Sequence, residues 1–170
     1  PSVSVSRSPS LSISLSPSIS VSLSISKSPS PSPSEGFAYY TRGNYAVLPT
    51  DDADLETGYS AQDVTDVASK NDVRVAQVAT QQFMVHQYKN FVGAHNTCLL
   101  EAELQTTLQP SSSTVYLQIY NRNTTTWDTV DSDTTSPMDT DFILIATIPD
   151  LTNYKDASNV ISSRVYQEAL

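Results

Sequence analysis

The chain has 170 residues, with 18 acidic and 9 basic side chains and a net charge of −9, and its length suits one domain with an appendage. This charge disfavours a protein that binds nucleic acid, which needs a basic surface, and one that docks on anionic lipid, which needs clusters of lysine and arginine. No apolar run is long enough to span a bilayer, the single Cys98 excludes an intrachain disulfide, and the four glycines form no phosphate-binding loop.

The first 34 residues, called the tail below, form a repeat in which serine occupies every even position from Ser2 to Ser34. The apolar odd positions are Val3, Val5, Leu11, Ile13, Leu15, Ile19, Val21, Leu23 and Ile25. Pro1, Pro9 and Pro17 recur every eight residues and divide the tail into strand-length segments at residues 3–5, 11–15 and 19–25. Alternation of apolar with small polar side chains is typical of a strand with one buried face.

Two interpretations of the tail stay open. Tracts rich in serine and proline are commonly spacers or O-glycosylated stalks, but a solvated spacer has no need of nine apolar side chains in strict alternation. The candidate glycosylation sites are Ser10, Ser12, Ser14, Ser16, Ser18, Ser20, Ser22, Ser24 and Ser26. Fully extended, the tail would reach on the order of 110 Å, far beyond a domain with a radius of gyration of about 14 Å. It is therefore expected to leave its own domain, with the apolar positions as subunit contacts.

Residues 35–170 are predicted to form one all-β domain. They carry a net charge of −11, because the tail holds two cations, Arg7 and Lys27, and no acid. Segments with alternating apolar side chains predict strands at residues 38–48, 73–78, 83–91, 98–106, 115–120, 127–130, 142–148 and 160–166. Residues 61–69 are acidic and rich in threonine, which favours a loop. About eight strands at this spacing predict a jelly-roll-like β-sandwich.

Five stretches of the chain resemble a known kind of module. They are residues 60–68 (SAQDVTDVA), 113–121 (STVYLQIYN), 127–129 (WDT), 139–142 (DTDF) and 164–167 (RVYQ). They look like a β-sandwich module of environmental bacterial surface proteins, in which a Ser-X/Ser-Pro tract is joined to such a module. The resemblance covers most of the chain and carries over no catalytic residue. It implies an extracellular, repeat-bearing surface protein.

Acidic residues gather in three groups in predicted loops. The groups are Asp51, Asp52, Asp54 and Glu56; Asp63, Asp66 and Asp72; and Asp131, Asp133, Asp139 and Asp141. Their spacing matches no EF-hand, so solvated loops and Asx-turns are the favoured interpretation and no cofactor is predicted, with a structural calcium kept as an alternative. Glu101 and Glu103 share one face of a strand, as a glycosidase pair could. That face is expected to be wet, and we predict that the chain is not an enzyme.

Aromatic and nucleophilic residues leave one further alternative. Tyr120 and Trp127 flank a predicted turn and could stack on sugar rings, although a core position is favoured for Trp127 because it begins an alternating segment. His86 is expected to be packed in a strand, and Cys98 in the core.

These observations predict a structural subunit of an extracellular filament or surface appendage, with another copy of the chain as its partner. The tail would pair with neighbouring subunits as an added strand, and covalent glycans are a further expected partner. The alternative is a carbohydrate-binding, adhesin or phage-fibre module on an O-glycosylated stalk. Neither prediction involves nucleic acid or a membrane span.

Overall fold

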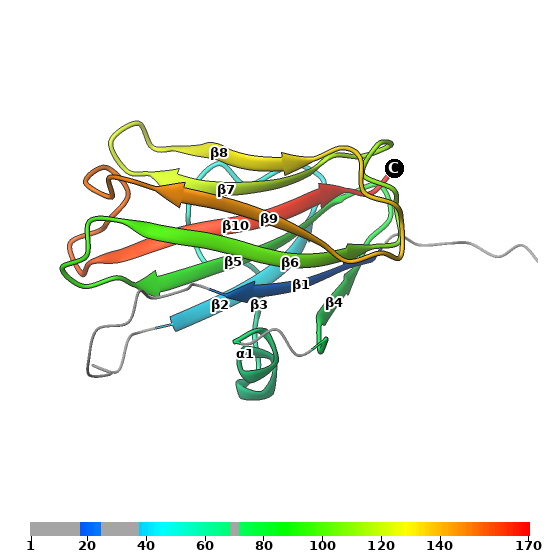
Figure 1. The fold of residues 1–170 in the computed structure, drawn as a ribbon, viewed down its shortest axis with the longest axis horizontal. Helices are drawn as coiled ribbons and strands as arrows, with labels where there is room; N and C mark the ends of the chain where they lie inside the picture. Colours follow the sequence, from blue (N-terminus) through cyan, green and yellow to red (C-terminus); the bar gives the residue numbers. More distant parts are fainter. Residues whose placement is uncertain (1–17, 25–37, 69–71) are drawn as a thin grey trace, which may run out of the picture.

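A computed structural model describes residues 18–24, 38–68 and 72–170. These residues form ten strands and one short helix (Figure 1). The strands are β1 (Ser18–Ser24), β2 (Ala38–Tyr45), β3 (Thr57–Gly58), β4 (Val75–Val78), β5 (Phe83–Phe91), β6 (Cys98–Thr106), β7 (Val115–Asn121), β8 (Thr126–Asp133), β9 (Phe142–Ile148) and β10 (Val160–Glu168), and the helix is α1 (Ala61–Val67). The all-β prediction is confirmed. In the described part of the chain, the one helix has seven residues, too few to cross a membrane.

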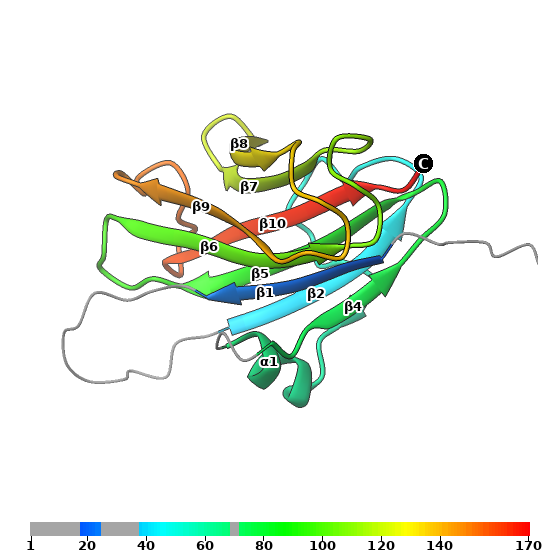
Figure 2. The ribbon, with the colours of Figure 1, turned by 45° about the vertical axis from the view of Figure 1, so that its right-hand side comes forward.

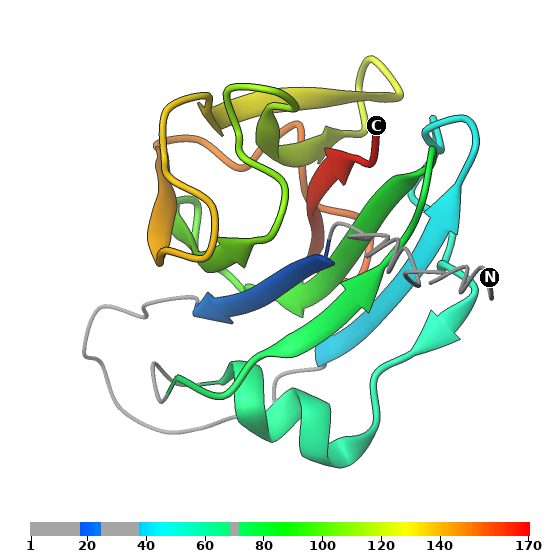
Figure 3. The same ribbon diagram turned by 90° about the vertical axis from the view of Figure 1, so that its right-hand side faces the viewer.

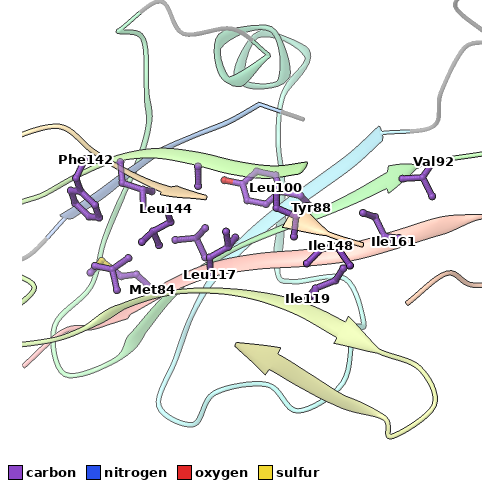
Figure 4. Packing of buried hydrophobic residues seen from close by; sticks show 14 of the residues in the cluster. Met84, Tyr88, Val92, Leu100, Leu117, Ile119, Phe142, Leu144, Ile148 and Ile161 are labelled. Carbon is purple, nitrogen blue, oxygen red and sulfur yellow. The ribbon is translucent and has the colours of Figure 1, made fainter. Parts of the chain in front are cut away.

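The strands form two antiparallel sheets that pack face to face as in a sandwich (Figure 3). Sheet A has the order β4-β1-β6-β9, and sheet B has the order β3-β2-β5-β10-β7-β8. Figure 4 shows the core between them, where Leu100 of β6 and Leu144 of β9 meet Met84, Leu117 and other residues of sheet B. Burial of these side chains removes apolar surface from water and holds the sheets together.

The sequence pattern predicts most strands correctly, because each presents alternate residues to the core. Strands β5 and β9 begin and end at the expected residues, and β6 covers the expected range. In β7, Val115, Leu117 and Ile119 are fully buried on one face, as expected. His86 is fully buried in β5, and Cys98 is half-buried against the core.

One expectation for the N-terminal part of the domain is wrong. Residues 61–67 form helix α1 instead of a loop. Its first turn is fixed by a capping box, in which the Ser60 hydroxyl accepts a hydrogen bond from the Asp63 backbone N–H (3.1 Å) and the Asp63 carboxylate accepts one from the Ser60 N–H (2.9 Å). Short polar side chains that suggest a loop are here the ones that begin a helix.

Candidate functional site

The tail contributes an internal strand of sheet A. Strand β1 runs antiparallel between β4 and β6, with ladder pairing on both sides (Figures 1 and 2). The sequence pattern places this segment against a neighbouring subunit, whereas the structure pairs it with strands of its own chain. The 13 residues between β1 and β2 (25–37) could span about 43 Å if extended, which is enough to return the strand to its own sheet.

The register of β1 matches the alternation of the tail. Its apolar positions Ile19, Val21 and Leu23 lie opposite Thr106, Leu104 and Ala102 of β6. These three β6 residues are fully buried. Directly opposed residues of an antiparallel pair occupy the same face of a sheet. The tail positions expected to need burial are therefore registered with the core face.

The serine positions of β1 are registered with the outer face of sheet A. Ser20, Ser22 and Ser24 lie opposite Gln105, Glu103 and Glu101. The remaining tail predictions lie outside the described residues. They concern the apolar positions Val3, Val5, Leu11, Ile13, Leu15 and Ile25 and the serines Ser10, Ser12, Ser14, Ser16 and Ser26.

The outer face of β6 is less wet than expected. Glu101 is only 8% exposed, and the Glu103 carboxylate faces the Arg74 guanidinium at 3.9 Å. The same guanidinium lies 2.6 Å from Asp141 and 3.8 Å from Asp72. Segments on either side of β6 thus cover the face that alternation alone predicts to be solvated.

Carboxylate oxygens of Asp72, Glu103 and Asp141 lie within 4.8 Å of one another. Arg74 already supplies a positive charge to this cluster. Carboxylates of this kind need no ion when a guanidinium neutralises them. The cluster is therefore accounted for as an ion-pair network, and it joins members of two acidic groups that are distant in sequence.

Many of the remaining acids hold loops, as the Asx-turn interpretation expects. Asp133 Oδ1 accepts hydrogen bonds from the backbone N–H groups of Thr135 (2.9 Å) and Ser136 (2.8 Å), and these bonds hold the pKa of that carboxyl below its usual value although burial opposes them. Asp52 forms an ion pair with Arg122 (2.9 Å). Asp54 forms one with Lys89 (2.6 Å).

Side chains of sheet B bind backbone groups on both outer edges of sheet A. At β4, Arg42 Nη1 donates to the Ala76 carbonyl (2.9 Å) and Asn44 Nδ2 donates to the Val78 carbonyl (2.8 Å). At β9, the Ile145 backbone N–H donates to Asp131 Oδ2 (2.7 Å). Unpaired edge groups are a template for uncontrolled strand addition, and polar side chains that bind them block it.

Tyr120 and Trp127 do lie together, on the outer face of sheet B. They are partners across β7 and β8, with ring centroids 5.1 Å apart. The Arg164 guanidinium lies 4.2 Å above the Trp127 ring, and the indole N–H donates to the Asp51 carbonyl (3.0 Å). The expected core position of Trp127 is wrong, because its strand presents it to the face opposite Leu117. Tyr120 is buried, which leaves little of its ring for a ligand.

A buried polar cluster was not expected from the sequence. The Tyr59 hydroxyl is hydrogen-bonded to His86 Nδ1 and lies 3.3 Å from the Tyr88 hydroxyl. Burial, together with the nearby Arg42 charge, lowers the pKa of His86 to about 3. Burial also raises the pKa of Tyr59 well above its ordinary value. Alternation with Met84 signals that His86 is buried, but nothing local signals that Tyr59, 27 residues earlier, is its partner.

Comparison with known proteins gave no significant match to a family model, to a curated protein or to a solved structure.

Proposed function

We propose that this chain is a structural subunit of an extracellular filament or surface appendage, assembled through strand exchange of its tail. The observation that carries the proposal is the place of β1, an internal strand of sheet A that comes from the tail. An element that is joined to its domain by a long connector can be donated to another copy of the same chain. A donated strand forms the same ladder bonds and fills the same register as the strand it replaces.

The position of β1 favours exchange over other modes of association. Without a strand there, sheet A would expose the facing edges of β4 and β6 and the buried residues opposite β1, among them Leu104. An empty position would destabilise the fold, because unpaired backbone groups and exposed apolar surface both raise its free energy. A strand in that position is therefore favoured. On the two outer edges, backbone groups are bound by Arg42, Asn44 and Asp131. Strand addition is thus directed to the position of β1.

Exchange between subunits generates an open polymer when the rotation from one copy to the next does not close. The domain charge of −11 opposes close approach of subunits, and salt screens this repulsion over a Debye length of about 8 Å at 0.15 M. We therefore expect moderate salt to leave assembly unchanged or to strengthen it. Soluble saccharides should have no effect; filaments that dissociate in saccharide would favour the alternative, a sugar-binding module that uses Trp127.

We infer a jelly-roll-like sandwich, because consecutive strands lie in different sheets at every step from β1 to β10 except β2–β3 and β7–β8. Repeated crossing between two antiparallel sheets is typical of that architecture. The resemblance to Ser-X surface proteins supports an extracellular place for it. It also supports O-glycans on the tail, which would give native protein a mass above the 18.5 kDa of the chain.

A disulfide that locks β1 into its own sheet tests the function. Ser20 and Gln105 are directly opposed across β1 and β6, and antiparallel Cα separations of about 4.5–5.5 Å suit a disulfide. The variant Ser20→Cys/Gln105→Cys, in a Cys98→Ser background, is oxidised at low concentration and then imaged by negative-stain electron microscopy. We expect the oxidised protein to stay monomeric and reductant to restore filaments.

The single variant Gln105→Cys, treated in the same way, is the matched control and should form filaments in both redox states. Filaments formed equally by locked and unlocked protein would refute strand exchange. Absence of filaments from the unmodified chain at every concentration would refute the filament function itself.

A further inference from the structure

We propose that residues 10–16 are a second strand for the position of β1 and that they occupy this position in a second copy of the chain. This inference rests on the proposed filament function, and it names the donated segment.

The two segments are nearly the same sequence. Residues 10–16 read SLSISLS, and β1 reads SISVSLS after a shift of eight residues. Each follows a proline, Pro9 or Pro17. The shift superposes Leu11 on Ile19, Ile13 on Val21 and Leu15 on Leu23. One of these pairs is identical, one is isomeric and one differs by a methylene group, so all four serines and all three apolar positions keep their chemistry.

The residues of β4 and β6 that lie opposite β1 are compatible with residues 10–16 in its place. The position of Ile13 would lie opposite Leu104 of β6 and Val75 of β4, where β1 has Val21. Both partners are apolar and buried. Cores tolerate swaps that conserve volume to within about a methylene group far better than they tolerate a charge. Residues 10–16 therefore suit the register that the structure shows for β1.

The other two segments at this spacing do not fit. Residues 2–8 (SVSVSRS) would place Arg7 opposite Ala102, which is fully buried. Residues 26–32 (SKSPSPS) would place Lys27 opposite Thr106, which is also fully buried. They would also place two prolines within a strand that is hydrogen-bonded on both sides. A buried unpaired charge is costly, and proline removes a ladder donor. Of four segments related by eight residues, the chain has two that suit one position.

The length of the connector favours a second copy for residues 10–16. They are joined to β2 by 21 residues (17–37), whereas β1 is joined by 13 (25–37). Extended, these connectors reach about 70 Å and about 43 Å. The shorter one favours return to its own sheet through a higher effective concentration, and the longer one leaves room for two domains to lie side by side. Each copy has one β1 position in sheet A and two segments that fit it.

Disulfide trapping between chains tests this inference. One chain carries Gln105→Cys, and a second carries Ser20→Cys, Ser12→Cys or Ser4→Cys, all in a Cys98→Ser background. Ser12 and Ser4 take the place of Ser20 after shifts of eight and sixteen residues. The full-length chains are mixed in reductant, allowed to assemble, oxidised and separated by non-reducing electrophoresis. We expect Ser12→Cys to yield at least about tenfold more cross-linked dimer than Ser4→Cys, since the latter register buries Arg7.

A yield from Ser12→Cys no higher than that from Ser4→Cys would overturn the inference. So would a Ser12–Gln105 disulfide that forms only within one chain carrying both cysteines. If Ser20→Cys cross-links between chains and Ser12→Cys does not, the donor is β1, and the inference fails while the filament function stands. If Ser12→Cys cross-links chains that form only closed dimers, the inference stands and the filament function fails.

Discussion

Acid should destabilise this protein through His86 as the pH falls below about 6.5. The imidazole is fully buried, its Nδ1 is bound to the Tyr59 hydroxyl, and its Nε2 has no partner among the described residues. The Tyr59 hydroxyl that binds it and the Tyr88 hydroxyl beside Tyr59 carry no negative charge at neutral pH, and the charge that acts on His86 is that of Arg42. Its pKa falls from 6.5 to about 3 because burial and Arg42 both oppose the imidazolium.

The lowered pKa of His86 makes the fold less stable as the pH falls. Between pH 6.5 and pH 3 the unfolded chain binds the His86 proton and the folded chain does not, so the free energy of unfolding falls as pH falls. The slope is about 1.4 kcal/mol per pH unit, or about 2–3 kcal/mol between pH 6.5 and pH 4.5. Asp133 and Asp150, whose pKa values hydrogen bonds hold below 3.8, lose their stabilising effect progressively from about one pH unit above that value downward.

Urea unfolding followed by tyrosine and tryptophan fluorescence at several pH values between 6.5 and 4.5 measures this slope. The variant His86→Gln is the control: it is less stable at every pH, but its slope should be smaller by about 1 kcal/mol per pH unit. Equal slopes in the two proteins would refute the assignment of the acid sensitivity to His86.

Three further predictions concern stability. Leu117→Ala should lower the free energy of unfolding, measured by urea titration, by about 2–5 kcal/mol, because Leu117 is fully buried. The control Ile145→Ala, at a residue 50% exposed, should change this free energy by less than about 1 kcal/mol. Similar losses in the two variants would contradict the burial described. Arg74→Ala should lower the melting temperature measured by calorimetry at low salt, because it leaves the carboxylates of the cluster facing one another. Part of this loss should be recovered in 0.5 M NaCl, and Arg74→Lys should lower the melting temperature less. A loss that does not depend on salt would contradict the assigned repulsion. Ser60→Ala should lower the free energy of unfolding by about 1 kcal/mol, because it removes the N-cap of α1. An unchanged free energy of unfolding would contradict the capping box.

Local patterns predict those parts of the fold that depend on one strand at a time. Alternation is enough to place β5 and β9 and to identify Leu117 as a core residue, because period two reports which face is buried. It misjudges Glu101 and Trp127, since a chain segment that covers the outer face of a sheet leaves no periodic signal in the strand beneath it. The Ser60–Asp63 capping box is local, but a seven-residue helix is too short for its period to stand out.

Pairings between distant segments are harder to predict. The sequence indicates that the tail contains strands, but not that residues 18–24 lie between β4 and β6, which are more than 50 residues away. The Tyr59–His86 bond and the Arg74 cluster depend on the same kind of long-range placement. Two chains with equal local patterns could differ in all of these contacts.

Ladder bonds on both sides of β1 have a mechanical consequence. A force applied to the tail along the strand axis loads the bonds to β4 and β6 in shear, so that they share the load, whereas an edge strand pulled sideways would unzip one bond at a time. A subunit attached through this strand is thus suited to carry tension. If a neighbouring tail occupies the position, the same geometry transmits the pull from one domain to the next through backbone hydrogen bonds.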